Sequence, residues 1–172
     1  MRKFSNVGLP KNLLLAIGHV AALWAQIEYT IDSKISEALA LPGAPKINPK
    51  LIIPFNQRLQ LLDQLCKQFL TDPENRKFAA KIVSELKQLI GLRNLIVHGA
   101  VRHSKQRRKR HVVYWFRRIA WDNPARIIEK RAMTVAEVEI FAHRLSNGFA
   151  SAGMFEVFFW SVERALLGKA GQ

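Results

Sequence analysis

A long row of apolar residues near the start of the chain most constrains its fold. Residues at this three-to-four spacing share one face of an α-helix. An apolar face of this length must be buried against other elements, so the row predicts an amphipathic helix over about residues 11–40. The residues of the row are Leu13, Ile17, Val20, Trp24, Ile27, Ile31 and Ile35.

Rows with the same period predict two further helices. The first carries Leu59, Leu62, Leu65 and Phe69. The second is predicted to begin at Thr71, whose hydroxyl can act as the N-cap, followed by Pro73 and Glu74. Gly99 is its predicted C-terminal end. Its apolar residues are Phe78, Ile82, Leu86 and Leu89.

Between residues 100 and 133 the pattern changes to β-branched and aromatic residues. Residues 112–119 predict a strand, Asp122-Asn123-Pro124 a turn, and residues 126–133 a returning strand. Residues 100–104 are a candidate third strand. Thr134 and Glu137 form a capping box, after which a last helix extends with apolar spacing to Leu166.

The positive charge of the chain is high and unevenly placed. The formal net charge is +14 for 172 residues. Residues 102–131 hold eleven basic residues against only Asp122 and Glu129. Such a concentrated field attracts polyanions, which favours nucleic acid as a partner, while a solvated hairpin that only keeps the protein soluble is the alternative. The basic residues are Arg102, Lys105, Arg107, Arg108, Lys109, Arg110, Arg117, Arg118, Arg126, Lys130 and Arg131.

Cysteine and histidine usage bounds the chemistry and the compartment. Cys66 is the only cysteine, so an intrachain disulfide and a CxxC zinc site are excluded, and a reducing, cytoplasmic setting is predicted. His103 and His111 have no carboxylate or cysteine spaced to complete a metal site, so no metal and no cofactor are expected. The apolar stretch near the N-terminus is interrupted by His19 and is interpreted as a helix and not as a signal peptide. No membrane association is expected.

Arg93, Asn94 and His98 form the candidate catalytic group. Asn94 and His98 are four residues apart and share a helix face, whereas Arg93 lies in the apolar row and needs an acid, Glu28 or Glu37, or a polar cleft. Arg93 and His98 lie about 140° apart around an ideal helix. Either the long arginine side chain wraps round, or two copies of the helix meet across a dimer axis. At the helix C-terminus the dipole favours a protonated His98, which suits a proton donor.

The run Arg93-Asn94-Leu95-Ile96-Val97-His98-Gly99 resembles the Arg-Asn-x-x-x-His motif of the HEPN family. The spacing Trp24-x-x-x-Glu28 and the basic hairpin before Thr134 are also similar to bacterial members. The resemblance implies an antiparallel bundle of four to five helices and a metal-independent endoribonuclease. It implies Arg93, Asn94 and His98 as catalytic residues, with Glu28 in support.

Further expectations concern organisation and partners. The whole chain, 1–172, is expected to form one HEPN-like domain with the hairpin inserted at about residues 100–133. Expected partners are RNA, a second copy of the chain, and an antitoxin or other protein, since many HEPN proteins act in toxin–antitoxin, phage-defence or RNA-processing systems. The residues expected to hold nucleic acid are Arg102, Lys105, Arg107, Arg108, Lys109, Arg110, Arg117 and Arg118.

Two other functions stay open on the sequence. One is a non-catalytic HEPN module that binds nucleic acid or a protein through the basic hairpin. The other is a structural or regulatory helical dimer whose charge serves only solubility. For the motif itself, the structural alternative is that His98 caps a helix and Arg93 pairs with Glu28. Tyr114, Trp115 and Trp121 lie among arginines and are candidates for base stacking, although packing against helices is the favoured interpretation.

Overall fold

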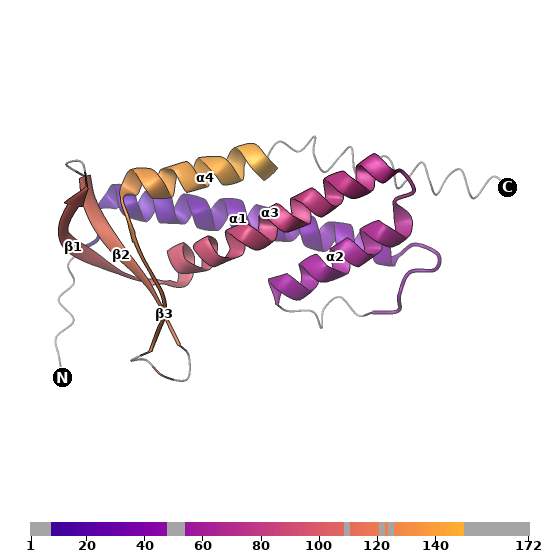
Figure 1. Ribbon diagram of the computed structural model, residues 1–172, viewed down its shortest axis with the longest axis horizontal. Helices are drawn as coiled ribbons and strands as arrows, with labels where there is room; N and C mark the ends of the chain where they lie inside the picture. Colours follow the sequence, from indigo (N-terminus) through magenta and orange to yellow (C-terminus); the bar gives the residue numbers. More distant parts are fainter. Residues whose placement is uncertain (1–7, 48–53, 109–110, 121–122, 124–125, 150–172) are drawn as a thin grey trace. The chain divides into compact units, whose positions relative to one another are not determined.

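The described residues form four helices and one three-stranded sheet (Figure 1). The computed structural model describes residues 8–47, 54–108, 111–120, 123 and 126–149. A mainly helical protein with a small antiparallel sheet was predicted, and this is confirmed. In chain order the elements are α1 (Lys11–Leu39), α2 (Phe55–Phe69), α3 (Pro73–His98), β1 (Ala100–Arg108), β2 (His111–Ile119), β3 (Ile127–Met133) and α4 (Val135–Phe149).

The apolar row near the start of the chain is the buried face of α1. The predicted bounds, 11–40, agree with the observed Lys11–Leu39. Leu13, Val20 and Ile31 have no exposed surface, and Trp24 is only 1% exposed. Among the described residues, α1 is the one helix long and apolar enough to cross a membrane by length and composition. Core helices of soluble proteins and signal sequences pass the same test, so α1 alone fixes no location.

The chain divides into two compact units, each of which contains part of α1 and part of α3. The first unit contains α1 up to Trp24, the described residues from Gly91 to Gly148, and therefore the sheet. The second contains the described residues from Ala25 to Ile90, with α2 and most of α3. The single-domain expectation did not include this division.

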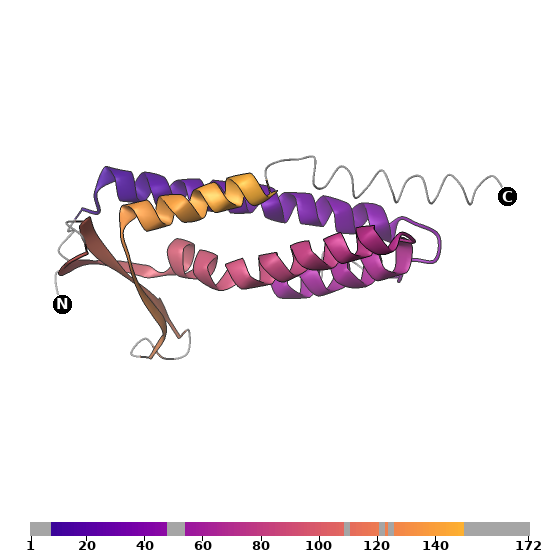
Figure 2. The same ribbon diagram turned by 45° about the horizontal axis from the view of Figure 1, so that its top comes forward.

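In the second unit, α2 lies beside the first part of α3 in both views (Figures 1 and 2). The core includes Leu59 and Leu86, which have no exposed surface, and Leu65, which is 2% exposed. These residues belong to the apolar rows that predicted the two helices. Burial of large aliphatic side chains contributes roughly 1.5–3 kcal/mol each, so the rows are the main source of stability here.

In the first unit, α4 lies beside the first part of α1 in both views (Figures 1 and 2). The core here joins helices to the sheet, because Leu95 of α3 and Phe116 of β2 have no exposed surface and Leu145 of α4 has 1%. The continuation of the last helix toward Leu166, which was predicted, lies outside the described residues.

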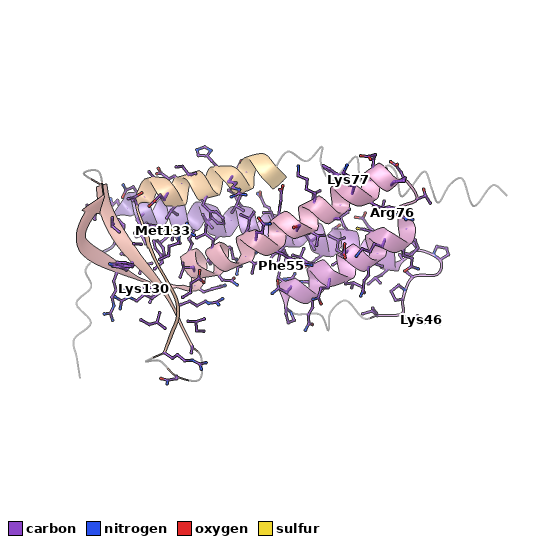
Figure 3. The ribbon with its side chains drawn as sticks, in the orientation of Figure 1. Lys46, Phe55, Arg76, Lys77, Lys130 and Met133 are labelled. Atoms are coloured by element: carbon purple, nitrogen blue, oxygen red, sulfur yellow. The ribbon has the colours of Figure 1, made fainter. Side chains whose placement is uncertain are left out.

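The sheet has the order β1-β2-β3, with both pairs antiparallel. The predicted hairpin and third strand are confirmed, and β1 extends to Arg108. Tyr114, Phe116 and Met133 are buried on one face, and Trp115 lies on the other. Figure 3 labels Met133 and Lys130, which both belong to β3. Register shifts occur between His103 and Arg107 in β1 and after Arg118 in β2. Most of the predicted turn at 122–124 lies outside the described residues.

The two predicted helix caps had different outcomes. At α4 the capping box is confirmed, since Glu137 N donates to Thr134 Oγ1 at 3.2 Å and Thr134 N donates to Glu137 Oε2 at 2.7 Å. At α3 the predicted Thr71 cap is wrong. Asp72 is the capping residue, because its Oδ1 accepts from Glu74 N at 3.2 Å. Pro73 is the first helical residue, and the residue immediately before it takes the N-cap position.

Candidate functional site

The site begins where α3 ends. The helix stops at His98, as Gly99 predicted, and Gly99 N donates to Leu95 O at 3.1 Å. A Cβ at Gly99 would lie 2.1 Å from Leu95 O and 3.4 Å from Arg117 O, so only glycine allows this approach. Ala100 then pairs with Arg117 of β2 and begins the sheet. The close approach at Gly99 thus fixes the end of α3 against β2.

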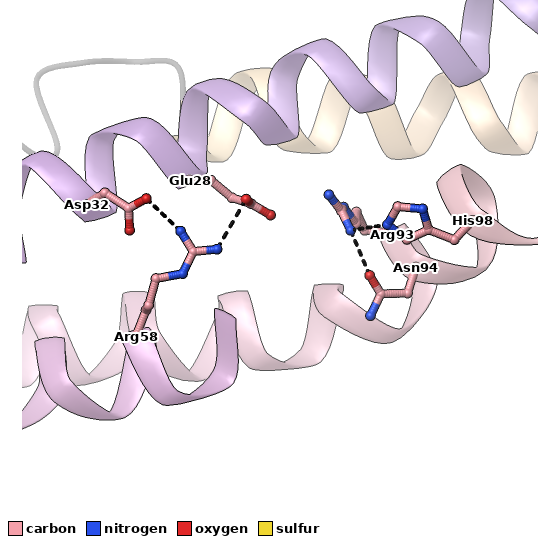
Figure 4. A network of polar contacts seen from close by, with 6 residues as sticks. All are labelled: Glu28, Asp32, Arg58, Arg93, Asn94 and His98. Atoms are coloured by element: carbon pink, nitrogen blue, oxygen red, sulfur yellow. Dashed lines mark hydrogen bonds and ion pairs between the residues drawn. The ribbon is translucent and has the colours of Figure 1, made fainter. Parts of the chain in front are cut away.

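Arg93, Asn94 and His98 meet within one chain (Figure 4). Arg93 Nη1 lies 2.9 Å from Asn94 Oδ1 and 2.8 Å from His98 Nε2. Of the two geometries that the sequence left open, the structure has the one in which the arginine side chain wraps round the helix. His98 is exposed and Arg93 is half-buried, so the group lies at the surface of the first unit.

The side chain of Arg93 makes a cation–π contact with Trp24. The Arg93 guanidinium carbon lies 5.5 Å from the centre of the Trp24 ring, and the ring is 1% exposed. A cation over an indole face is stabilised by about 0.5–2 kcal/mol. This partly offsets the free-energy cost of placing the Arg93 guanidinium among the apolar residues of its helix face. The sequence placed Trp24 in the core row but did not indicate this contact.

The contact with Arg93 fixes the direction of one hydrogen bond at His98. A guanidinium has only donors, so at 2.8 Å the His98 Nε2 must accept the hydrogen bond. The ring is then neutral, with its proton on Nδ1. From the helix dipole, the sequence predicted a protonated His98 ring that donates a proton. In the observed geometry, protonation of Nε2 and the Arg93 contact exclude each other, and His98 is arranged as a proton acceptor.

Glu28, the weaker supporting candidate, takes part in an ion pair in the second unit. Arg58 of α2 donates to Glu28 Oε2 at 3.2 Å and to Asp32 Oδ2 at 2.6 Å (Figure 4). Burial lowers the pKa of Arg58, but the hydrogen bonds and charges of Asp32 and Glu28 outweigh it and raise the pKa. The other acid considered for Arg93, Glu37, forms an ion pair with Lys34 at 2.7 Å.

The predicted nucleic-acid-binding residues follow the sheet. Arg102 is exposed on β1, and Arg117 and Arg118 are half-buried on β2. Arg118 Nε lies 4.0 Å from Glu129 Oε2, at the limit of an ion pair. Of the others, Lys105, Arg107 and Arg108 belong to β1, whereas Lys109 and Arg110 lie outside the described residues.

Among the residues that the structure describes, no group of three or more His, Cys, Asp or Glu side chains gathers as a metal ion would need. Comparison of the chain with protein-family models, curated proteins and solved structures gave no match. The resemblance to HEPN proteins therefore depends on the residues of this chain alone. Function has to be argued from the chemistry of the site and not from the fold.

Proposed function

We propose that the chain is a metal-independent, HEPN-type endoribonuclease with Arg93, Asn94 and His98 as its catalytic residues. The observation that carries the proposal is the position of Arg93 Nη1, which contacts Asn94 Oδ1 and His98 Nε2 at 2.9 and 2.8 Å. A fixed positive charge and a proton acceptor thus lie within one hydrogen bond of each other on an exposed helix end. The proposal includes a HEPN-like antiparallel helical bundle and a cytoplasmic location.

The chemistry that this pair supports is attack by a ribose 2′-oxygen on the adjacent phosphorus. The bond from the 2′-oxygen to phosphorus forms and the bond from phosphorus to the 5′-oxygen breaks. His98 Nε2 accepts the 2′-hydroxyl proton. Solvent water protonates the departing 5′-oxygen, and the hydroxide that remains takes the proton from His98. Arg93 exchanges its contact with the ring for the phosphate oxygens, whose negative charge grows in the transition state.

Asn94 and Trp24 position the arginine for this step. The Asn94 side-chain oxygen accepts from Arg93 Nη1, and the guanidinium carbon lies over the Trp24 ring. Holding a charge in place before the reaction avoids the cost of reorganising it as the transition state forms. Glu28 stays the proposed supporting residue, and its ion pair with Arg58 joins α1 to α2 within the second unit.

The proposed partners are RNA, a second copy of the chain, and an antitoxin or other protein. One ground for the dimer no longer holds, because a single chain brings Arg93 and His98 into contact. The other ground is the excess of aromatic residues on the last helix, which was predicted to extend to Leu166. Of these, Phe141 is buried in the core of the first unit, and the part of the helix after Phe149 lies outside the described residues. The dimer is therefore proposed as an assembly and not as a requirement for the Arg93–His98 contact.

The test is cleavage of a mixed-sequence single-stranded RNA by the purified chain with a chelator present. His98→Ala and Arg93→Ala should each abolish cutting, and Arg93→Lys should restore little, since an ammonium lacks the planar fork. Products should carry 2′,3′-cyclic phosphate and 5′-hydroxyl ends. His143→Ala and Arg144→Ala are matched controls on the exposed surface of α4 and should cut like the wild type.

Two results would contradict the proposal. Equal cutting by the wild type and His98→Ala would place the activity elsewhere or in a contaminant. Cutting that disappears with the chelator and returns with a divalent ion would show a metal-dependent reaction.

A further inference from the structure

One face of the sheet combines basic side chains with an aromatic ring. In the strand register Arg102 lies opposite Trp115, and Arg117 lies opposite Lys130. Directly opposed residues of antiparallel strands share a face, as do residues two apart on one strand. Arg102, Trp115, Arg117 and Lys130 therefore share one side of the sheet, which we call the basic sheet face. The 4.1 Å separation of Lys130 Nζ from the Trp115 ring centre agrees with this assignment.

The charges on this face are not compensated locally. Arg117 and Lys130 are directly opposed like charges, an arrangement that destabilises a sheet by itself. The buried Nε of Arg117 has no hydrogen-bond partner among the described residues. Among the register positions 100, 102, 115, 117, 130 and 132, none is acidic. Glu129 is on the other face, near Arg118. An anion held between Arg117 and Lys130 would remove the repulsion between these two charges.

Trp115 supplies a second kind of contact. Trp115 is half-buried, and the long side chain of the exposed Lys130 reaches over its ring. A nucleobase that slides onto the ring displaces the Lys130 ammonium, which then meets the phosphate of the same nucleotide. Aromatic rings bind unpaired bases by stacking and cannot reach them in a duplex. Buried Tyr114, in contrast, is packed in the core as expected.

We propose that the basic sheet face binds single-stranded nucleic acid, with a base stacked on Trp115 and phosphates held by Arg102, Arg117 and Lys130. Ala100, the partner of Arg117, lies two residues after His98. At about 3.3 Å per residue, the face begins roughly 7 Å along the backbone from the candidate site. The inference depends on the proposed function for RNA as the natural ligand, and the stacking itself requires no cleavage.

The test measures binding of a fluorescein-labelled oligothymidylate to the full chain by anisotropy. DNA lacks the 2′-hydroxyl, so a failed nuclease assay and failed binding are separate results. Trp115→Ala should weaken binding about tenfold, and Trp115→Phe should stay within about threefold of the wild type. Tyr29→Ala removes a 76% exposed aromatic side chain from α1 and should have no effect. The same variants should bind a DNA duplex as the wild type does, since its bases are hidden.

Salt dependence tests the phosphate contacts separately and does not require Trp115 to be changed. Arg117→Gln and Lys130→Gln should each reduce the slope of log affinity against log salt by about 0.7. Lys87→Gln, which removes an exposed charge from α3, should leave the slope unchanged. Circular dichroism checks that each variant is folded.

Four results would contradict the proposal. The first is a Trp115→Ala effect no larger than that of Tyr29→Ala. The second is an equal effect of Trp115→Ala on single strands and duplex, which would mean that no base stacks. The third is competition by polyglutamate of matched charge as strong as that by unlabelled oligothymidylate, which would assign the face to acidic proteins. Unchanged salt slopes for Arg117→Gln and Lys130→Gln would remove the phosphate contacts.

Discussion

Replacing Gly99 with alanine adds one methyl group at a crowded position and should lower the stability of the fold. In Gly99→Ala the new Cβ would lie 2.1 Å from Leu95 O, whereas ordinary contact begins near 3.4 Å. About 1.3 Å of backbone movement is therefore required, and the obstacle is the carbonyl of the helix itself. The movement breaks the bond from Gly99 N to Leu95 O, which contributes about 1 kcal/mol, and strains the junction by about 1–3 kcal/mol more.

The substitution should thus reduce the free energy of unfolding by about 2–4 kcal/mol. For a chain of this length each kcal/mol corresponds to about 2–4 °C in Tm, so a fall of roughly 4–16 °C is expected. Differential scanning calorimetry and urea unfolding followed by circular dichroism measure it. His98 precedes Gly99, so cleavage should fall as well if the proposed function is right.

Gly91→Ala is the matched control on the same helix. A Cβ there meets nothing within 4 Å, and alanine is favoured over glycine in a helix by about 1 kcal/mol. The two Gly→Ala substitutions should therefore have opposite signs, with Gly91→Ala slightly raising Tm. If Gly99→Ala is as stable as the wild type, the close approach of Leu95 O to residue 99 is refuted, and the account of how α3 ends is refuted with it.

Three further predictions concern the Cys66 thiol, the proposed dimer and the basic residues 107–110. Burial, with a smaller contribution from Asp63, raises the pKa of Cys66 from 9.0 to about 12. The folded thiol should resist Ellman's reagent at pH 8 and react on unfolding. Stability should fall as pH rises from 9 to 12, where only the unfolded thiol loses its proton. Light scattering should report about 39 kDa for the proposed dimer, twice the 19.6 kDa chain, and a monomer at every concentration would remove it. Neutralising Arg107, Arg108, Lys109 and Arg110 together should lower the salt dependence of RNA binding, and an unchanged slope would make the run a solvated surface.

The sequence predicted the helices well because apolar spacing is a local property that tertiary packing then exploits. The row from Leu13 to Ile35 located α1 to within one residue at its end. Thr71 failed as the cap of α3 for a local reason too. Both Thr71 and Asp72 can accept from the first turn, and the position of Pro73 favours the residue immediately before it.

The side-chain contacts of the site were less accessible to sequence reasoning. Angles on an ideal helix separate Arg93 from His98, but they describe the backbone, and the reach of an arginine spans the difference. The Trp24 ring under Arg93 joins residues 69 positions apart in the sequence, a separation at which spacing carries no signal. In the sheet, the opposition of Arg117 and Lys130 depends on register, which a one-residue slip would abolish.

The tautomer of His98 gives the most direct test of the site that does not depend on activity. In the wild type, long-range ¹H–¹⁵N correlation spectra of the neutral ring should show the proton on Nδ1, because Nε2 accepts from Arg93. Arg93→Met keeps an unbranched side chain over Trp24 and removes every donor, so the proton should become free to occupy Nε2. Arg144→Met removes an exposed arginine of α4 and should leave the tautomer unchanged. A wild-type ring protonated on Nε2 while neutral would disprove the contact. Nε2 of His98 would then carry the proton and could not accept one from a 2′-hydroxyl, and this conclusion would hold whether or not the chain cleaves RNA.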